Sequence, residues 1–410
     1  MRLTKMAKAA DTLQFSLVLL GLLLIVFKTC NAYCHLNVTL LKSRDSPMVI
    51  QKENGHLKAV MPSFIQDNYV FINLTGQDIN LACPGKENRF DFIKNNPANF
   101  KCGTAENRTV FYIDGQDFDH SLVTCFDYLI AYENELNQTC HDGKGELFEI
   151  GFQIDSQQFY RMYTICYNIE SGFSYYAKHS IEGFPDYPSH HHHLLKQFSV
   201  MNPRMAKKLI HVLTFMRRKR QYDRLSNILG LKISEKYFRG QNHFFTGVTL
   251  VPHADFLVTS HQTATHIKAN LLFLWKPREV LWRTLEYNIR LLARNKTINI
   301  ITGVLDRAKI NNNTLYMGPQ NSLPIHSYLW KFVADPKTNK CILFLMENFV
   351  IDDNVKHKCN LPCTQNGWLK HYKWKKSDYR VFFCCDISEM KETISDIPSN
   401  SKCTSILTLE

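Results

Sequence analysis

Four consecutive basic residues, Arg217 to Arg220, form a group whose chemistry is readable from the sequence alone. Such a run can contact a phosphate backbone, mark a dibasic site for a processing protease, or lie on the solvated face of a helix, and the sequence leaves these three interpretations open. The whole chain of 410 residues carries a formal net charge of +12. A charge of this sign favours a polyanionic partner, which includes nucleic acid, glycosaminoglycan and an anionic membrane face.

A carboxylate and a guanidinium, Glu286 and Arg290, lie four residues apart, a spacing that puts both side chains on one face of a helix. Many surface helices carry such a pair, which stabilises them by roughly 0.2–0.5 kcal/mol. The nearby stretch GVTLVPHADF contains Thr249 and His253, and His261 and His266 follow it. Imidazole titrates near neutral pH and can accept a proton there, whereas a threonine hydroxyl cannot.

The first residues and the cysteines indicate the compartment. A basic start, the apolar run from Phe15 to Phe27 and small residues before Tyr33 predict a signal peptide over residues 1–32, although an uncleaved anchor fits too. The remaining twelve cysteines form two groups of six, with none between Cys166 and Cys341, and favour disulfides within each group. Six N-x-[ST] sequons also favour a secreted glycoprotein, free of integral membrane contact after cleavage.

The hydrophobic patterns predict two domains. Short β-rich runs with turn residues predict a small disulfide-stapled β domain over residues 33–177, and a Pro-, Gly- and His-rich stretch predicts a linker over 178–197. Four histidines in it (190–193) fit a loose metal site or a solvated loop. Residues 198–410 predict an α+β domain with a helix from Pro203 to Gly230, an amphipathic helix over 279–295, and buried strands over 265–275, 298–305, 340–351 and 379–387.

A series of short motifs adds a resemblance to this pattern. The stretches LVPHADF, ATHIKAN, LFLW, WRTLEYNIRLLA and INIITG occur in the order in which the DNA/RNA non-specific endonucleases, the ββα-metal nucleases, carry related motifs. The later stretches LPIHSYLWKFVADPKTNK and FFCCDISEM are similar to those of the secreted insect members. The resemblance covers about residues 199–400. It implies a ββα-metal nuclease-like domain whose central, mostly antiparallel sheet is flanked by helices.

The resemblance also implies a reaction and a set of site residues. In this family a histidine activates water, one Mg²⁺ held by an asparagine stabilises the phosphate, and arginines neutralise its charge. Asn270 falls on the asparagine that ends the ATFxxxN motif. Glu286 falls on the helix glutamate that fixes metal-bound water, and Arg290 on the helix arginine.

Three family residues are missing. The motif places Thr249 at the position of the general-base histidine and Gly247 at that of the neighbouring arginine. The metal-binding asparagine is absent from WKPREVLW, where Glu279 is the nearest carboxylate that can replace it. We therefore expect a secreted protein that binds nucleic acid or another polyanion with lost or much reduced hydrolysis, with Mg²⁺ or with no metal. The alternatives are an active Mg²⁺-dependent endonuclease with surrogate residues and a non-enzymatic interaction protein. The oligomeric state stays open.

Overall fold

A computed structural model describes most of the chain from His35 onward. The described residues are 35–37, 45–53, 56–60, 62–66, 69–73, 79–85, 87–91, 93, 95–105, 108–118, 123–155, 157–183, 202–209, 212–256, 259–349, 359, 361–370, 372–373, 380–397 and 403–409. The predicted signal peptide (1–32) and the four histidines (190–193) lie outside them. No helix in these ranges is long and apolar enough to cross a membrane.

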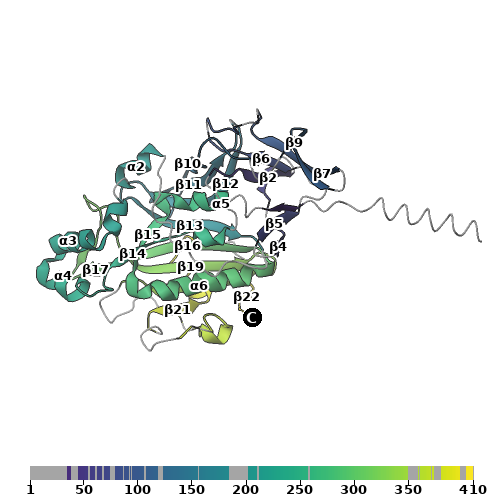
Figure 1. Ribbon diagram of the computed structural model, residues 1–410. Helices are drawn as coiled ribbons and strands as arrows, with labels where there is room; N and C mark the ends of the chain where they lie inside the picture. The colour runs from purple at the N-terminus through teal and green to yellow at the C-terminus, as the bar shows by residue number, and fades with distance from the viewer. Residues whose placement is uncertain are drawn as a thin grey trace, which may run out of the picture.

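A nine-stranded sheet forms the centre of the molecule (Figure 1). Eight strands follow one another in antiparallel pairs, in the order β10, β11, β12, β13, β16, β19, β20 and β21, and β22 pairs with β20 in parallel. Their bounds are Tyr132–Cys140, Gly145–Gln153, Phe159–Asn168, Phe173–Ile181, Ile298–Arg307, His326–Asp335, Lys340–Glu347, Phe382–Cys385 and, for β22, Ser405–Ile406. The large antiparallel sheet confirms the predicted fold class.

The sheet crosses the domain boundary that the sequence predicts. Strand β13, expected to end the N-terminal domain, pairs with β16 from Tyr176 opposite Gly303 to Ile181 opposite Ile298. The strands over 132–181 therefore share one sheet with those beyond residue 298. The boundary at 177/198 does not separate two sheets, because strand patterns predict strands without telling which sheet each joins.

Two smaller sheets lie N-terminal to the central sheet. One has the order β1, β5, β4 (His35–Asn37, Tyr69–Asn73, Phe64–Gln66). The other has the order β3, β2, β6, β7, β8, β9 (His56–Ala59, Met48–Glu53, Ile79–Ala82, Ala98–Ala105, Arg108–Ile113, Gln116–Phe118). This β-rich, disulfide-containing region is therefore shorter than residues 33–177.

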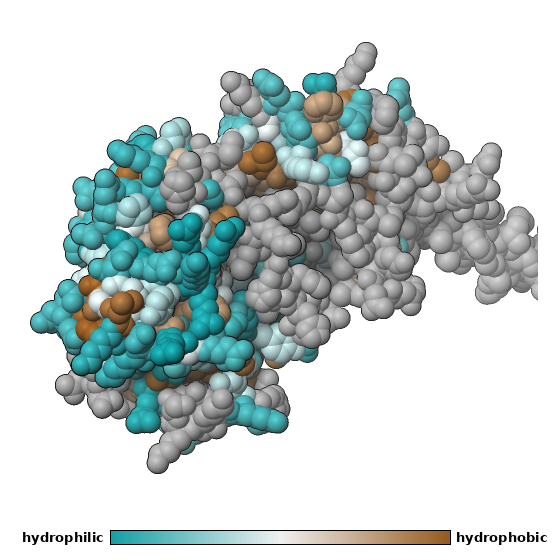
Figure 2. All heavy atoms as spheres, turned by 60° about the vertical axis from the view of Figure 1, so that its left-hand side comes forward, coloured by the Kyte–Doolittle hydropathy of each residue, from teal (hydrophilic) through white to brown (hydrophobic). Residues whose placement is uncertain are grey.

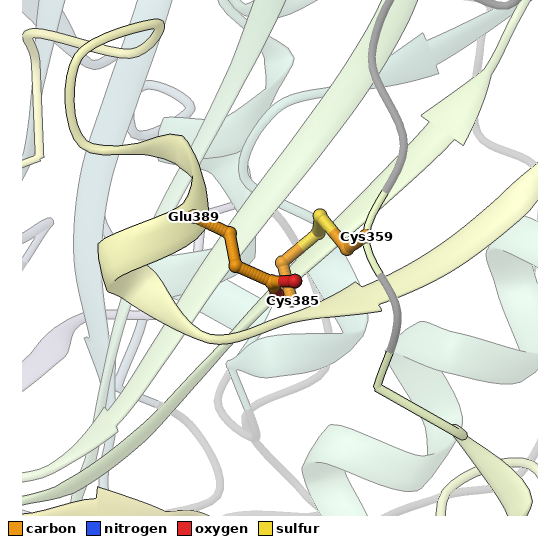
Figure 3. A group of neighbouring side chains, drawn as sticks. All are labelled: Cys359, Cys385 and Glu389. Atoms are coloured by element: carbon orange, nitrogen blue, oxygen red, sulfur yellow. A yellow bond between two sulfur atoms is a disulfide. The ribbon is translucent and has the colours of Figure 1, made fainter.

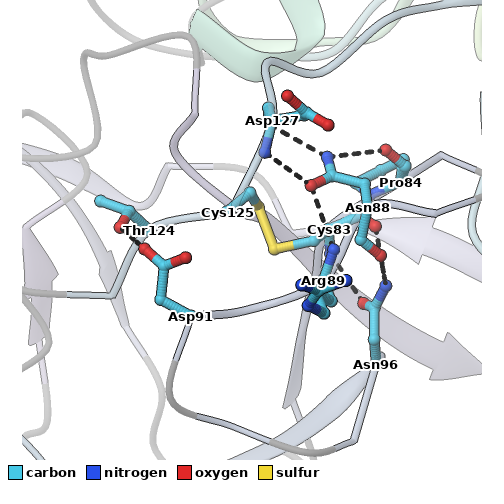
Figure 4. Close-up of a disulfide and its surroundings, with 9 residues drawn as sticks. All are labelled: Cys83, Pro84, Asn88, Arg89, Asp91, Asn96, Thr124, Cys125 and Asp127. Atoms are coloured by element: carbon cyan, nitrogen blue, oxygen red, sulfur yellow. Dashed lines mark hydrogen bonds between the residues drawn. A yellow bond between two sulfur atoms is a disulfide. The ribbon is translucent and has the colours of Figure 1, made fainter.

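The Cys83–Cys125 disulfide ties the six-stranded sheet to the segment that leads into β10 (Figure 4). Beside it, the Asn88 amide nitrogen donates to the carbonyls of Pro84 and Asp127, and its oxygen accepts from the Asp127 amide. The Asn96 side chain donates to the Cys83 carbonyl at 2.7 Å. These side-chain bonds satisfy backbone groups beside the disulfide that are not paired within a β-ladder.

A helical lobe, residues 212–239, stands at one end of the central sheet (Figure 1). It consists of the 3-10 turn η2 (Val212–Met216), α3 (Arg218–Leu229) and α4 (Leu231–Phe238), whereas α2 (Pro203–Leu209) lies beside β10 and β11, to which Arg204 is bound. The single helix predicted from Pro203 to Gly230 is thus interrupted before Arg218. The break lets both Met216 and Gln221 face the hairpin strand that follows.

The hairpin β14 (Phe245–Thr249) and β15 (Leu271–Trp275) leads into α6 (Glu279–Leu292). The order strand, strand, helix is the one that the resemblance implies. Between the strands lie η3 (His253–Asp255), α5 (Thr259–Gln262), η4 (Thr263–His266) and η5 (Lys268–Asn270), so the strand predicted from residue 265 begins only at Leu271. The short elements η6 (Lys276–Arg278), η7 (Ala293–Asn295), β17 (Lys309–Ile310), β18 (Asn313–Thr314), η8 (Thr364–Asn366) and α7 (Ile387–Met390) complete the described structure.

Both faces of the sheet are covered. Helix α6 packs on one face through residues that recur at helical spacing, among them Leu281, Trp282, Leu285 and Ile289. On the other face Tyr328, Trp330 and Phe332 of β19 join a separate apolar cluster with Met390, Ile394 and Ile397. Burial on both faces explains why β20 is a nearly continuous apolar run.

Five described disulfides confirm pairing within each group of cysteines: Cys83–Cys125, Cys140–Cys166, Cys341–Cys403, Cys359–Cys385 and Cys363–Cys384. The adjacent Cys384 and Cys385 have different partners, as disulfide geometry requires. Since side chains alternate along a strand, the two bonds leave β21 on opposite faces of the sheet. Cys384 belongs to the α6-side cluster and Cys385 to the other one.

Candidate functional site

Thr249 ends β14 and pairs with Leu271, the residue directly after Asn270. The two positions that the resemblance aligns with the family's histidine and asparagine are therefore neighbours at one end of the hairpin. The Thr249 side chain is half-buried. Its hydroxyl stays protonated near neutral pH and cannot activate water as a general base.

Gly247, at the position of the family's arginine, faces the helical lobe. A Cβ atom added to Gly247 would lie 2.9 Å from Sδ of Met216 and 3.3 Å from its Cε. The 3-10 turn η2 thus covers the strand where the family has a long cationic side chain. The space that an arginine side chain at position 247 would need is occupied by Met216.

Asn270 holds the chain that follows β14. Its oxygen accepts from the Val251 amide at 2.9 Å, and its nitrogen donates to the carbonyls of Val251 and Thr265, each at 3.0 Å. The side chain is fully buried. Asn270 therefore satisfies buried backbone groups and fixes the turn between the hairpin strand and η3.

Arg290 lies in the interior between α6 and the sheet. Its side chain is 0 % exposed, and Nη1 lies 2.9 Å from Oδ1 of Asp255. The second oxygen of Asp255 accepts from Nε2 of His179, on β13, at 2.8 Å. The enclosed guanidinium has a carboxylate partner in place of the phosphate that the resemblance implies.

The charge state of this triad follows from its partners. Burial alone would raise the pKa of Asp255, but the hydrogen bond from His179 and the charge of Arg290 lower that pKa to about 2. Burial lowers the pKa of His179 despite the carboxylate beside it, so the imidazole is neutral and donates through Nε2. The triad is thus one ion pair with a neutral histidine.

Glu286 lies in a second buried pair. Its Oε1 is 4.0 Å from Nζ of Lys331, on β19, and both side chains are nearly inaccessible. Lys331 also donates to Oγ1 of Thr302 at 2.7 Å and lies over the ring of Trp282. Burial raises the pKa of Glu286 and lowers that of Lys331, and each charge partly offsets the shift of the other. The contacts of Glu286 bind α6 to the sheet.

Glu279 is a poor replacement for the metal-binding asparagine. Its carboxylate contacts the ammonium of Lys276 and accepts from Nε and Nη2 of Arg283 at 2.9 and 2.7 Å. Burial alone would raise the pKa of Glu279, but these hydrogen bonds lower it below its usual value. Mg²⁺ needs several free oxygen ligands, and two cations already neutralise this carboxylate. The residues present therefore do not fit the family's metal ion.

Cys359, Cys385 and Glu389 form the one group within the described ranges that has the proximity of metal ligands (Figure 3). The two sulfur atoms are joined in a disulfide. The Glu389 carboxylate accepts from the Asp386 amide and completes a capping box at the start of α7. Oxidised sulfur does not bind zinc as thiolate does, so this cluster is structural.

The histidines near the hairpin are differently placed. His253 begins the 3-10 turn η3, four residues after β14 ends at Thr249. His261 is 2 % exposed, and burial lowers its pKa to about 4. It lines a cavity of about 650 Å³ together with Tyr160, His179 and Asp255. Thr249, Glu279, Glu286 and Arg290 are not among the described residues that line it.

Sequence reasoning misses His179, which donates to Asp255, and Lys331, which is the partner of Glu286. Both lie on strands of the central sheet, far along the chain from α6. Lys331 has a visible signal, since it is the single cation in the otherwise apolar stretch YLWKFV. A charge on the inward face of a buried strand requires a partner there.

The chain thus has a mixed α/β fold with a large antiparallel sheet, several disulfides and a strand–strand–helix element. No family model matches it. It is similar to the salivary endonuclease of Lutzomyia longipalpis, with 23% identity over 372 residues, which cover 88% of this chain and 82% of that protein. It is also similar to the salivary protein Tsal2A of Glossina morsitans morsitans, with 21% identity over 407 residues, 93% and 97% of the two chains.

These two similarities extend over nearly whole chains. They support a likeness to a non-specific endonuclease-like family. A chain of the crystal structure of the EndoG/EndoGI complex aligns with 12% identity and a TM-score of 0.34, over 61% of this chain and 89% of that one. This last likeness is too slight to carry an argument.

Proposed function

We propose that the protein is a secreted binder of nucleic acid that hydrolyses phosphodiesters weakly or not at all. The observation that carries the proposal is the fate of the family's catalytic set. Thr249 stands in place of the general-base histidine. The Glu279 carboxylate is ion-paired with two cations, and Arg290 is buried in an ion pair with Asp255. Each loss removes a different contribution to the reaction, so a single surrogate does not restore it.

Secretion is part of this proposal. It is supported by the signal-like first 32 residues, by five disulfides and by relatives named as salivary proteins. Binding is supported by the net charge of +12. A protein that neutralises several phosphates releases counterions, so its affinity falls steeply as salt rises.

The test measures cleavage and binding with the same preparation of the full chain. Plasmid DNA and a long RNA are incubated with and without Mg²⁺ or Mn²⁺, and we expect turnover near background. Fluorescence anisotropy with a labelled duplex at several salt concentrations measures affinity, and we expect a straight decline of log K with log salt.

Two results would contradict the proposal in different ways. Metal-dependent cleavage that Glu279→Gln or His253→Ala abolishes would identify an active enzyme with surrogate residues. Binding that ignores salt, or no binding of nucleic acid at all, would favour an interaction protein. The triple variant Gly247→Arg, Val248→Gly, Thr249→His should remain nearly inactive, since it restores no metal ligand.

A further inference from the structure

The helical lobe, residues 212–239, holds half of the excess positive charge of the protein. It contains eight Lys and Arg residues and two acidic residues, a net charge of +6 out of +12 for the whole chain. The lobe is less than a tenth of the sequence. The charge that favours a polyanionic partner is therefore concentrated at one end of the molecule.

Much of this charge is exposed. Arg217, Lys219, Arg220 and Lys232 are exposed, and within the part of the chain that the structure describes their side chains have no ion-pair or hydrogen-bond partner. Figure 2, which turns the lobe towards the viewer, shows mainly hydrophilic side chains on this side of the molecule, around a small hydrophobic patch. By contrast, Arg218 donates to the carbonyls of Arg239 and Gly240, and Arg224 to those of Tyr316 and Gly318.

The position of the basic run within α3 gives it no role in helix stability. Arg218 to Arg220 form the first turn, which has no acidic residue. Cations in the first turn oppose the helix dipole and destabilise a helix. The next residue, Gln221, is buried and exchanges two hydrogen bonds, of 2.7 and 2.8 Å, with the backbone of Phe245. A helical segment anchored in this way does not offer a processing protease the exposed, unpaired backbone that cleavage needs.

The lobe is firmly attached to the strand–strand–helix element. Besides the Gln221 bonds, Met216 covers Gly247, and the ring of Phe238 packs against Phe245, Trp275 and Phe349. The cations of the lobe are therefore held in a fixed position beside the hairpin. A preformed surface loses little conformational entropy when a partner binds.

We propose that the exposed face of α3 and α4 is the surface on which this protein binds duplex nucleic acid. This inference rests on the proposed function and names the surface that performs it. Helix α3 has twelve residues and is about 18 Å long, which corresponds to roughly five base pairs of a duplex. Guanidinium groups donate in pairs to phosphate oxygens, and Arg217 and Arg220 supply two of them.

The same surface does not suit a membrane. Binding in a lipid interface needs an apolar helix face beside the basic one. Among the described residues of the lobe, Leu231 is the one large hydrophobic side chain that is strongly exposed. A sulfated polysaccharide is also a polyanion, so a competition experiment has to distinguish it from a nucleic acid duplex.

The experiment removes charge from the lobe and compares an equal removal elsewhere. The lobe variant combines Arg217→Gln, Lys219→Gln, Arg220→Gln and Lys232→Gln. The control combines Lys101→Gln, Lys144→Gln, Lys309→Gln and Lys337→Gln, which are also exposed. Both lose four charges at the surface, and equal urea midpoints for the two proteins verify that each is folded.

Binding of a labelled 20-base-pair duplex is measured by anisotropy over a range of salt. Each phosphate contact contributes about 0.9 to the slope of log K against log salt, so the lobe variant should lose about 3 to 4 slope units and more than tenfold in affinity near physiological salt. The control should lose less than one slope unit.

The outcomes separate this inference from the function on which it rests. If the wild-type chain does not bind the duplex, the proposed function is wrong. If it binds and the lobe variant keeps the wild-type slope, the binding surface lies elsewhere and only the inference is overturned. If heparan sulfate displaces the duplex at far lower charge concentration than unlabelled duplex does, the polysaccharide replaces nucleic acid as the partner.

Discussion

The Arg290 side chain is fully buried and pairs with Asp255. We therefore expect it to contribute to the free energy of unfolding. Arg290→Met leaves a buried carboxylate without its cation. Breaking a buried pair in this way costs roughly 3–5 kcal/mol in the free energy of unfolding. Urea unfolding measures this loss. Arg294→Met is the matched control, because Arg294 is exposed one turn further along and its loss should change stability by less than about 0.5 kcal/mol.

The same variant tests the role implied by the family. When both proteins are folded, Arg290→Met and Arg294→Met should bind a duplex alike. A tenfold loss of affinity with Arg290→Met at unchanged stability would show instead that the guanidinium reaches a phosphate.

His261 should make stability depend on pH. Its pKa in the folded protein is about 4, whereas an unfolded histidine titrates near 6.5. Between these values the unfolded chain binds more protons, so stability is lost as pH falls from 6.5 to 4, by about 3 kcal/mol from this group. His261→Phe should flatten the decline, measured by urea unfolding at several pH values. His243→Phe, at an exposed position, should leave it as in the wild type.

At the scale of elements, η2 and β14 are matched to each other by the contact of Met216 with Gly247. Gly247→Ala should cost little, because the end of a methionine side chain can move aside. Gly247→Arg needs far more space and should destabilise the protein by about 1–3 kcal/mol. Adding Met216→Ala should recover part of this loss.

A double-mutant cycle by urea unfolding measures the coupling between the two positions, which we expect to exceed about 1 kcal/mol. Equal stability of Gly247→Arg and the wild type would mean that η2 does not close the strand. That result would also remove the structural objection to restoring the family's arginine.

The sequence predicts which family residues the candidate site lacks, but it does not predict which residues the remaining side chains contact. The absence of histidine at Thr249 follows from the motif alone. The spacing of Glu286 and Arg290 correctly places them on one helix. It cannot say that this face is buried, because their partners, Lys331 and Asp255, come from distant elements. Nor can the sequence tell whether Asn270 is a catalytic-site residue or a buried side chain that binds backbone groups.

At the scale of the whole molecule, the sheet ties early strands to late ones. Strand β16 lies between β13 and β19, so a fragment of residues 198–410 lacks one of its neighbours. An unpaired, largely apolar strand edge promotes aggregation. We expect this fragment to be insoluble, and a fragment of residues 128–410, which keeps β10 to β13, to be soluble. Size-exclusion chromatography and far-UV circular dichroism compare them. A monomeric, folded 198–410 would support the boundary predicted from the sequence.

The fold class and the disulfide groups were accessible from the sequence, whereas the domain boundary was not. Alternating runs over 132–181 have the same appearance in a small independent β domain and in a large sheet. The gap between Cys166 and Cys341 also suggested two units. The decisive contacts, such as Tyr176 with Gly303, join residues far apart in the chain and leave no mark on local patterns.

The two disulfides of β21 have a consequence for how molecules of this protein meet one another. Leu361 bridges to Cys384, so the segment around it lies along β21 at the end of the central sheet. Cys359 and Cys363, on either side of Leu361, are fastened to opposite faces of that strand. The two disulfides therefore hold this segment against β21, which is then not free to pair with a strand of a second molecule. Reduction would release the segment and leave a hydrophobic strand available for intermolecular pairing, so we expect reducing agents to promote aggregation.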